Sequence, residues 1–189
     1  MISLILKPKT EFDPQLVELA KTDTDAFAQL YDYFFPKVFA FVVSKVGSTD
    51  AAEDIVSEVF IKVVQNLPKY QDRGAPFAAW LFTIARNLIF DYYSKQAKQK
   101  EVPLDEGIEV KDEREESPAD LAKQTELKEK VMEVMRQLPE RELSIMQLKF
   151  FSGLTNREIA ATLNLSENNV GIIIYRVLRR LKPDLNNYL

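Results

Sequence analysis

The sequence contains neither cysteine nor histidine among its 189 residues. The absence of cysteine excludes a disulfide framework and fits a reducing compartment such as the cytosol. Together the two absences remove thiol nucleophiles, imidazole bases and the usual zinc ligands. Carboxylates alone can hold Mg²⁺, but nowhere in the sequence do they cluster in an apolar context. We therefore expect no metal, no cofactor and no catalytic residues.

Long hydrophobic runs are also missing. The apolar stretch at the N-terminus, MISLILKPKT, is too short for a signal peptide, and no run reaches the roughly 18 apolar residues of a membrane span. Glycine is scarce, with 5 residues, and hydrophobic residues make up 46% of the chain. This composition allows one moderate core or two small ones. We expect a soluble cytoplasmic protein without membrane insertion, and the helical spacing of its apolar residues predicts an all-α fold.

Charge is unevenly distributed along the chain. The net charge is −4, but residues 101–122 carry nine acidic and two basic side chains, whereas residues 149–182 carry six basic and two acidic ones. Residues 101–118 also lack apolar periodicity, which predicts a flexible acidic linker. We therefore divide the chain into an N-terminal unit at 1–100, this linker, and a C-terminal unit at 119–189. The positive charge of the C-terminal unit favours a nucleic-acid partner.

Local signals mark several helix ends in the N-terminal unit. Asp23 or Thr24 can cap a helix whose apolar residues continue to Val42. Pro36 interrupts this pattern, so we expect the helix to bend or restart there. Asp50, with an acid three residues later, predicts a capping box for the next helix.

That next helix, predicted at 51–67, has one apolar and one polar face. The apolar face consists of Ile55, Val56, Val59, Phe60, Val63 and Leu67. The other face carries Glu53, Asp54, Ser57, Glu58, Ile61, Lys62 and Gln65. Two interpretations remain open, because the acids suit both favourable interaction with the helix dipole on a solvated face and an acidic surface for a partner.

The helix predicted at 76–100 carries aromatic residues on two faces. Its core stripe consists of Phe77, Trp80, Leu81, Ile84, Leu88 and Tyr92. Its opposite face carries Phe82, Arg86, Phe90 and Tyr93, with Asn87 at the edge. Aromatic rings beside a cation and an amide suit the stacking of unpaired bases. The alternative is a helix buried on both sides, with this face covered by a neighbour.

The C-terminal unit contains a helix-turn-helix pattern. A helix over Glu140–Phe150 stops at Gly153, and Thr155 with Glu158 predicts a capping box for the next one. Asn164 tolerates the left-handed conformation that ends this helix, after which Ser166 caps a last helix running to Pro183. The spacing is typical of DNA-binding helix-turn-helix units.

The last helix has a core face and a polar face. The core face consists of Val170, Ile173, Ile174, Val177, Leu178 and Leu181. The exposed residues are Glu167, Asn168, Asn169, Gly171, Ile172, Tyr175, Arg176 and Arg179. Side chains of these types can read base edges and hold phosphates. The alternative is a plain helical hairpin whose basic face is only solvated.

In this order, the segments resemble the sigma-70 family of bacterial RNA polymerase initiation factors, in particular its small two-domain extracytoplasmic-function group. In the N-terminal unit the resemblance rests on AFAQLYDYFFPKVFAF, AEDIVSEVFIKVVQNLPKY and FAAWLFTIARNLIFDYYSK. In the C-terminal unit it rests on LPERELSIMQLKFFSGLTNREIAATLNLSENNV and YRVLRRL. It implies two small helical domains, a region 2-like bundle and a region 4-like four-helix unit with the helix-turn-helix.

The resemblance also implies a role for each surface. The face from Glu53 to Gln65 would dock on core RNA polymerase. A loop and one amide would capture a flipped base of the melted minus-ten element, and these residues are Tyr70, Gln71, Asp72, Arg73, Gly74 and Asn87. Phe82, Arg86, Phe90 and Tyr93 are added to the single-strand contacts from helix geometry. The minus-thirty-five duplex would be read by the exposed residues of the last helix together with Thr155, Arg157 and Ser166.

The implied function is promoter-specific initiation of transcription, with core RNA polymerase and promoter DNA as partners. An anti-sigma factor is a common further partner in this group. Two alternatives are a helix-turn-helix regulator that does not recruit polymerase and a protein-binding adaptor. The sequence departs from many family members at Gly171–Ile174, where basic residues are common. We therefore expect Arg176 and Arg179 to make the phosphate contacts.

Overall fold

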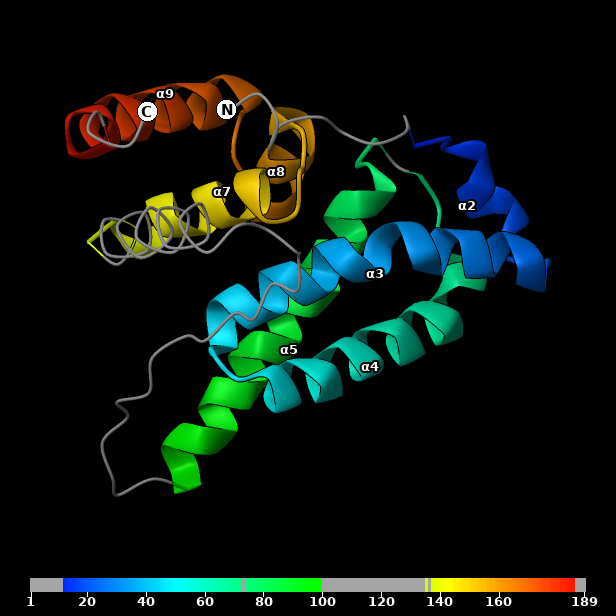
Figure 1. The fold of residues 1–189 in the computed structure, drawn as a ribbon. Coiled ribbons are helices and arrows are strands. Elements are labelled where there is room, and N and C mark those ends of the chain that lie inside the picture. Colours follow the sequence, from blue (N-terminus) through cyan, green and yellow to red (C-terminus); the bar gives the residue numbers. More distant parts are fainter. Residues whose placement is uncertain (1–11, 73, 100–134, 136, 186–189) are drawn as a thin grey trace, which may run out of the picture.

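The computed structural model describes residues 12–72, 74–99, 135 and 137–185 (Figure 1). Every regular element within these ranges is a helix, which confirms the predicted all-α fold class. The N-terminal unit comprises α2 (Gln15–Leu19), α3 (Thr24–Val46), α4 (Thr49–Asn66), the 3₁₀ turn η1 (Leu67–Lys69) and α5 (Phe77–Gln99). The C-terminal unit comprises α7 (Glu140–Phe150), α8 (Asn156–Leu163) and α9 (Glu167–Leu185). The predicted linker and the predicted start of the second unit at residue 119 lie outside the described residues.

The N-terminal unit is a bundle of α3, α4 and α5 with the short α2 against the start of α3. Its core includes Leu30, Val38, Val56 and Leu81, which are almost completely shielded from solvent. All six residues predicted for the apolar face of the 51–67 helix are buried, five of them on α4 and the last, Leu67, at the start of η1. The helical spacing therefore predicted correctly which side of α4 packs on the bundle.

Helix ends in this unit follow the sequence signals only in part. Pro36 lies inside α3, so the helix does not restart there. Phe34 and Val38 on either side of it are buried in the core, and this packing holds the helix together despite the missing backbone N–H. The predicted cap of the next helix was wrong. The cap of α4 is Ser48 rather than Asp50, since α4 already begins at Thr49. The other predicted cap is present, because the Asp23 carboxylate accepts hydrogen bonds from two backbone N–H groups of α3.

The C-terminal unit has the predicted helix-turn-helix geometry. Thr155 and Glu158 form a reciprocal capping box at the start of α8. Asn164 ends α8 in the left-handed conformation, with φ of 55°. The hydroxyl of Ser166 accepts from the backbone N–H of Asn169 at 3.2 Å and caps α9, which runs past Pro183 to Leu185. The turn between α8 and α9 is therefore fixed by the side chains that predicted it.

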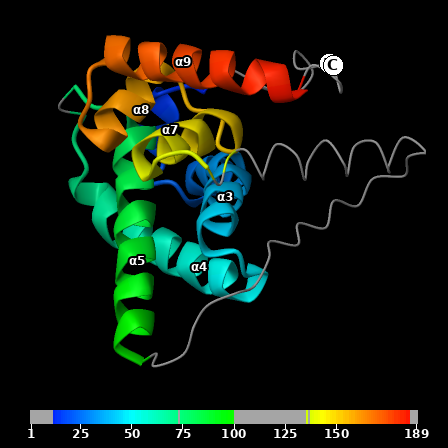
Figure 2. The same cartoon turned by 90° about the vertical axis from the view of Figure 1, so that its left-hand side faces the viewer.

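The two units pack against each other, with α7 near the end of α3 and α8 on α5 (Figure 2). At the α3–α7 contact, Lys45 Nζ donates to Glu140 Oε1 at 2.6 Å and to Ser144 Oγ at 3.0 Å. Beside it, Gln147 Nε2 donates to the Ser44 carbonyl at 2.9 Å. We refer to the contacts of α7 and α8 with α3 and α5 as the inter-unit contact.

Candidate partner and nucleic-acid interfaces

The polar face of α4 points away from the bundle. Glu53, Asp54, Ser57, Glu58, Ile61 and Gln65 are all exposed. Lys62 is half-buried and pairs with Glu58 at 3.6 Å, one turn away. Six of these seven side chains are polar or charged, and the seventh, Ile61, is apolar and 55% exposed. The structure thus brings the seven predicted docking residues together on one outer face.

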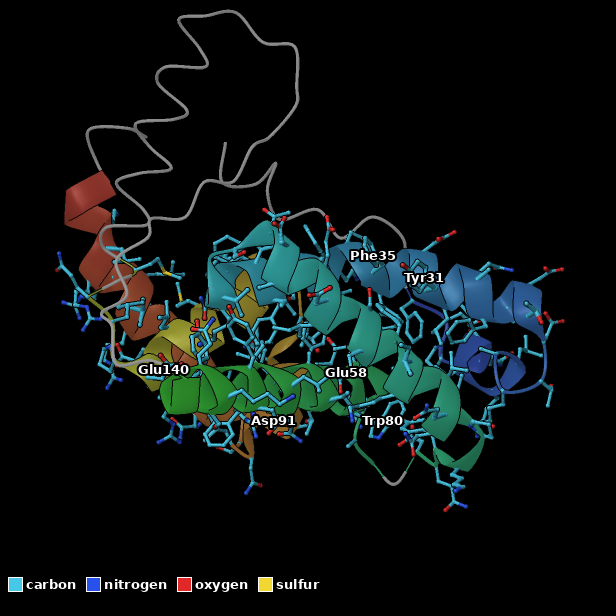
Figure 3. All side chains as sticks on the ribbon, turned by 90° about the horizontal axis from the view of Figure 1, so that it is seen from below. Tyr31, Phe35, Glu58, Trp80, Asp91 and Glu140 are labelled. Atoms are coloured by element: carbon cyan, nitrogen blue, oxygen red, sulfur yellow. The ribbon has the colours of Figure 1, made fainter. Side chains whose placement is uncertain are left out.

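An apolar groove adjoins this face. It has a volume of about 390 Å³ and lies between α3 and α4. It is lined by Phe27, Tyr31, Ser57, Phe60, Ile61, Val64 and Gln65. Tyr31 stacks on Phe35 at 5.2 Å, and Figure 3 shows both rings on α3, with Glu58 on α4. An elongated partner can therefore meet acidic groups and an apolar groove side by side.

Sequence reasoning missed the contribution of α3 and of Val64 to this groove. The available signal was the spacing of four residues between Phe27, Tyr31, Phe35 and Phe39, which places four rings in one row along α3. None of the four is fully buried. A row of partly buried aromatic rings beside the core of α3 indicates a surface that a partner can contact.

The aromatic residues predicted for the second face of α5 differ in their burial. Phe82 is fully buried and meets Phe41 of α3 edge-on at 5.5 Å, so the prediction of a base-stacking ring at this position was wrong. The cause is geometric, because α3 packs directly over that part of α5. Phe90, two turns further along, is 72% exposed and has no aromatic neighbour among the described residues. Of the three rings predicted for this face of α5, Phe90 is the most exposed.

Arg86 and Tyr93 make contacts that the sequence did not indicate. Arg86 Nη1 donates to the Thr162 carbonyl of α8 at 3.0 Å, although the residue remains exposed overall. The Tyr93 hydroxyl donates to the Lys45 carbonyl at 2.5 Å. Partial burial, with smaller contributions from Tyr92 and Glu140, raises the pKa of the Tyr93 phenol. Arg86 therefore contacts the C-terminal unit, whereas Tyr93 contacts α3 within its own unit.

The loop between η1 and α5 positions only part of the predicted base pocket. Tyr70 is buried, with its ring against Phe77 and Trp80, so its ring does not face outward as a base-stacking platform. Burial, with smaller contributions from Asp72 and Glu18, raises the pKa of its phenol. Gln71, Asp72 and Gly74 are exposed, and Arg73 lies outside the described residues.

Gly74 gives this loop its shape. Its backbone N–H donates to Asp72 Oδ1 at 2.8 Å, and its φ of 92° is a conformation that favours glycine. Asn87 is exposed on α5 but lies about three turns from the start of that helix, on the order of 16 Å along its axis. A nucleotide strand that contacts both this loop and Asn87 must therefore run along α5.

The outer face of α9 carries the predicted duplex-reading residues. Glu167, Asn168, Ile172, Tyr175, Arg176 and Arg179 are exposed, and Asn169 and Gly171 are partly exposed. Leu178, which we expected in the core, is 44% exposed because it lies at the edge of the apolar face. Arg157 of α8 is exposed. The hydroxyl of Thr155, which caps α8, is hydrogen-bonded to Glu158. The hydroxyl of Ser166 accepts from the backbone N–H of Asn169 at the start of α9.

The two predicted phosphate-binding arginines differ in their surroundings. Arg176 Nη2 donates to Glu142 Oε1 at 2.6 Å, and Arg180 Nη2 donates to Glu142 Oε2 at 3.0 Å. Glu142 belongs to α7 and is largely buried. Arg179 makes no ion pair with any described residue. Arg179 is thus the freer of the two for a phosphate.

We expect Glu142→Gln to lower the free energy of unfolding by about 1–2 kcal/mol, because it weakens two charge-assisted hydrogen bonds between α7 and α9. The side chains of Arg176 and Arg180 are more than half exposed, so the loss falls short of that of a fully buried pair. Urea unfolding followed by circular dichroism measures it. An unchanged midpoint would show that the carboxylate contributes nothing to the packing of α9.

Gly171→Ala is expected to raise the free energy of unfolding by about 0.5–1 kcal/mol, because alanine favours the helix and its methyl would meet only the Asn156 side chain at 3.6 Å. Gly153→Ala serves as the control. Gly153 has φ of 67°, so the same added methyl should destabilise the protein. A stability loss at Gly171 in urea unfolding would contradict this account of the helix.

Neither a metal centre nor a membrane span is found in the part of the chain that the structure describes. No three carboxylates gather there to hold a metal ion. None of the helices there combines the length and the apolar composition needed to cross a bilayer. The candidate sites described above are surfaces of α4, α5 and α9.

Two family models match the chain, one in each unit. The model described as Sigma-70 region 2 matches residues 30–99, and the model described as Sigma-70, region 4 matches residues 128–181. The first match includes most of α3 and all of α4 and α5. The second includes α7, α8 and most of α9. The candidate surfaces on α4, α5 and α9 thus all lie within these two matches.

Curated relatives and solved structures agree with these matches. The chain is 32% identical to "ECF RNA polymerase sigma factor BldN" of Streptomyces coelicolor over 90% of its own length and 66% of the relative's. It is 27% identical to "ECF RNA polymerase sigma factor SigW" of Bacillus subtilis, over 92% of its own length and 96% of the relative's.

The fold resembles that of the Bartonella quintana sigma factor RpoE, with a TM-score of 0.65 at 23% identity, covering 85% of this chain and 96% of that one. It also resembles CnrH, with a TM-score of 0.63 at 24% identity over 93% and 97%. This likeness confirms the prediction of two helical domains. The chain therefore belongs to the sigma-70 family, in its extracytoplasmic-function group.

Proposed function

We propose that the chain is a promoter-specificity factor, which binds core RNA polymerase and directs it to initiate transcription at particular promoters. The observation that carries the proposal is the presence in one chain of both sigma units in order, each with a free surface of suitable chemistry. The chain itself catalyses nothing in this proposal and acts in the cytoplasm, where its polymerase is found.

Docking on the polymerase is assigned to the outer face of α4. The exposed Asp54 and Glu58 supply charge complementary to a basic partner helix, and Ile61 borders the apolar groove. Charged rims mainly steer association, whereas apolar residues seated in pockets hold the complex. The groove between α3 and α4 is therefore the proposed anchor of the interface.

Contact with the melted strand is assigned to the loop before α5 and to the outer residues of that helix. The proposed residues are Gln71, Asp72, Arg73, Gly74, Arg86, Asn87, Phe90 and Tyr93. Phe90 supports this assignment because its ring is exposed and can stack on a base. Phe82 and Tyr70 are left out because both rings are buried.

Binding of the duplex is assigned to α9 and to Arg157 of α8. Asn168 lies near the N-terminus of α9, where side chains of a recognition helix reach base edges, and Arg179 is placed for a phosphate. We assign residues 1–100 to docking and melting, and residues 119–189 to duplex recognition.

An anti-sigma factor is a further proposed partner. RpoE from Bartonella quintana was solved with the anti-sigma factor NepR, and CnrH was solved with the cytosolic domain of CnrY. The open groove on α3 and α4 offers such a partner an apolar surface. Occupancy of this groove would block the proposed polymerase dock.

In vitro transcription with cognate core polymerase on a promoter library tests the proposal. We expect start sites that depend on this chain and are absent with core polymerase alone. A helix-turn-helix regulator that does not recruit polymerase would bind duplex DNA but would create no such start sites. Absence of chain-dependent start sites with active core polymerase would overturn the proposal.

A further inference from the structure

The centre of the outer face of α9 is apolar. At 100° per residue, Asn168, Ile172, Tyr175 and Arg179 lie within about 40° of one line along the helix. Ile172 is 54% exposed and Tyr175 is 67% exposed, and Tyr175 makes no hydrogen bond within the described residues. We call these four residues the reading stripe.

Neither of the two arginines near this stripe places its charge beside Ile172 and Tyr175 at the centre of the helix. Arg176 lies about 80° from the line through Asn168, and Glu142 holds its guanidinium against α7. Arg179 lies two turns beyond Ile172, where side chains of a recognition helix reach phosphates. Ile172 and Tyr175 are therefore the residues that face outward at the centre of the helix.

The chemistry of these two positions selects one feature of DNA. The major groove presents hydrogen-bonding edges at every base pair, but its apolar group is the C5 methyl of thymine. We infer that Ile172 and Tyr175 are specificity-determining residues that contact thymine methyl groups in the upstream promoter element. This inference rests on the proposed function and adds the kind of base that the helix selects.

The neighbours of the apolar pair favour DNA over a protein partner. Asn168 lies one turn before Ile172, and a carboxamide pairs in bidentate fashion with adenine. Asn168 and Ile172 together suit neighbouring A·T pairs, one read through adenine and the next through its thymine methyl. Arg179 completes the stripe with a charge for phosphate, whereas a protein-docking patch would need a larger continuous apolar area.

The test uses holoenzyme, assembled from core polymerase and the full chain, on a promoter found by the library experiment. Each thymine of the upstream element is replaced in turn by deoxyuridine, which removes only the methyl group. We expect affinity for the duplex to fall about three- to tenfold at one or two positions, as for the loss of one or two buried methyl groups. At those positions Ile172→Ala or Tyr175→Ala should abolish the difference between thymine and uracil.

Leu178→Ala is the matched control, because Leu178 is an exposed apolar residue of the same helix outside the stripe. This substitution should leave unchanged the ratio of the affinities for the thymine and uracil duplexes. Equal affinity for thymine and uracil at every position would overturn the inference. A thymine preference that persists in both Ile172→Ala and Tyr175→Ala would overturn it as well. Loss of transcription in the stripe variants without a change in duplex affinity would also overturn it and would indicate a protein partner. Failure of the proposed function is distinct, since the unaltered chain would then give no specific start sites.

Discussion

Replacing Phe82 by alanine is expected to lower the free energy of unfolding by about 3–5 kcal/mol. The ring is completely buried between α5 and α3, where it meets Phe41, so its removal leaves a cavity that the helices cannot close. Urea unfolding followed by circular dichroism measures the loss. A change below about 1 kcal/mol would show that the ring is not part of the core.

Phe90→Ala is the matched control, because it removes the same ring from the same helix. Phe90 is 72% exposed, so the substitution should alter the free energy of unfolding by no more than about 0.5 kcal/mol. If Phe90 stacks on the melted strand, the same variant should shorten the lifetime of the open promoter complex. A stable variant with an unchanged open complex would remove Phe90 from the proposed single-strand contacts.

Replacing Ile61 by aspartate is expected to weaken binding to core RNA polymerase by at least about 30-fold. Ile61 borders the groove between α3 and α4, and a carboxylate there would be desolvated against an apolar partner side chain. Fluorescence anisotropy with labelled chain and core polymerase measures the affinity. Because Ile61 is exposed in the free chain, its substitution should leave the fold intact.

Leu19→Asp provides the comparison. Leu19 is 59% exposed, close to the 55% of Ile61, but it lies at the end of α2 and does not line the groove. The two variants have the same change in charge and a similar change in exposed apolar area. Equal loss of polymerase affinity in both would argue against the groove as the anchor.

The features that could be predicted from the sequence are those with a local cause. The capping box of Thr155 with Glu158 and the left-handed Asn164 need only their neighbours in the chain, and both are present in the structure. The apolar face of α4 follows from helical spacing in the same way. The seven predicted docking residues therefore share one outer face.

The fate of the second face of α5 could not be predicted, because it depends on residues distant in sequence. Phe82 and Phe90 were assigned to one face, yet they differ by about 80° around the helix, and α3 covers only the first. Arg86 is separated from its partner Thr162 by 76 positions. No local pattern indicates a contact over that distance, because it depends on how the two units pack against each other.

The contact between the two units sets an energetic condition on binding. The inter-unit contact includes the hydrogen bond from Arg86 to Thr162 of α8 and the ion pair of Lys45 with Glu140 of α7. A ligand that displaces the hydrogen bond from Arg86 to Thr162 binds only the fraction of molecules in which this contact is open. Its apparent dissociation constant is then the intrinsic one divided by that fraction. If the melted strand is such a ligand, as proposed above, the contacts between the units lower the affinity of the free chain for it. A partner that holds the units apart removes this cost beforehand, and the two binding events thereby become cooperative.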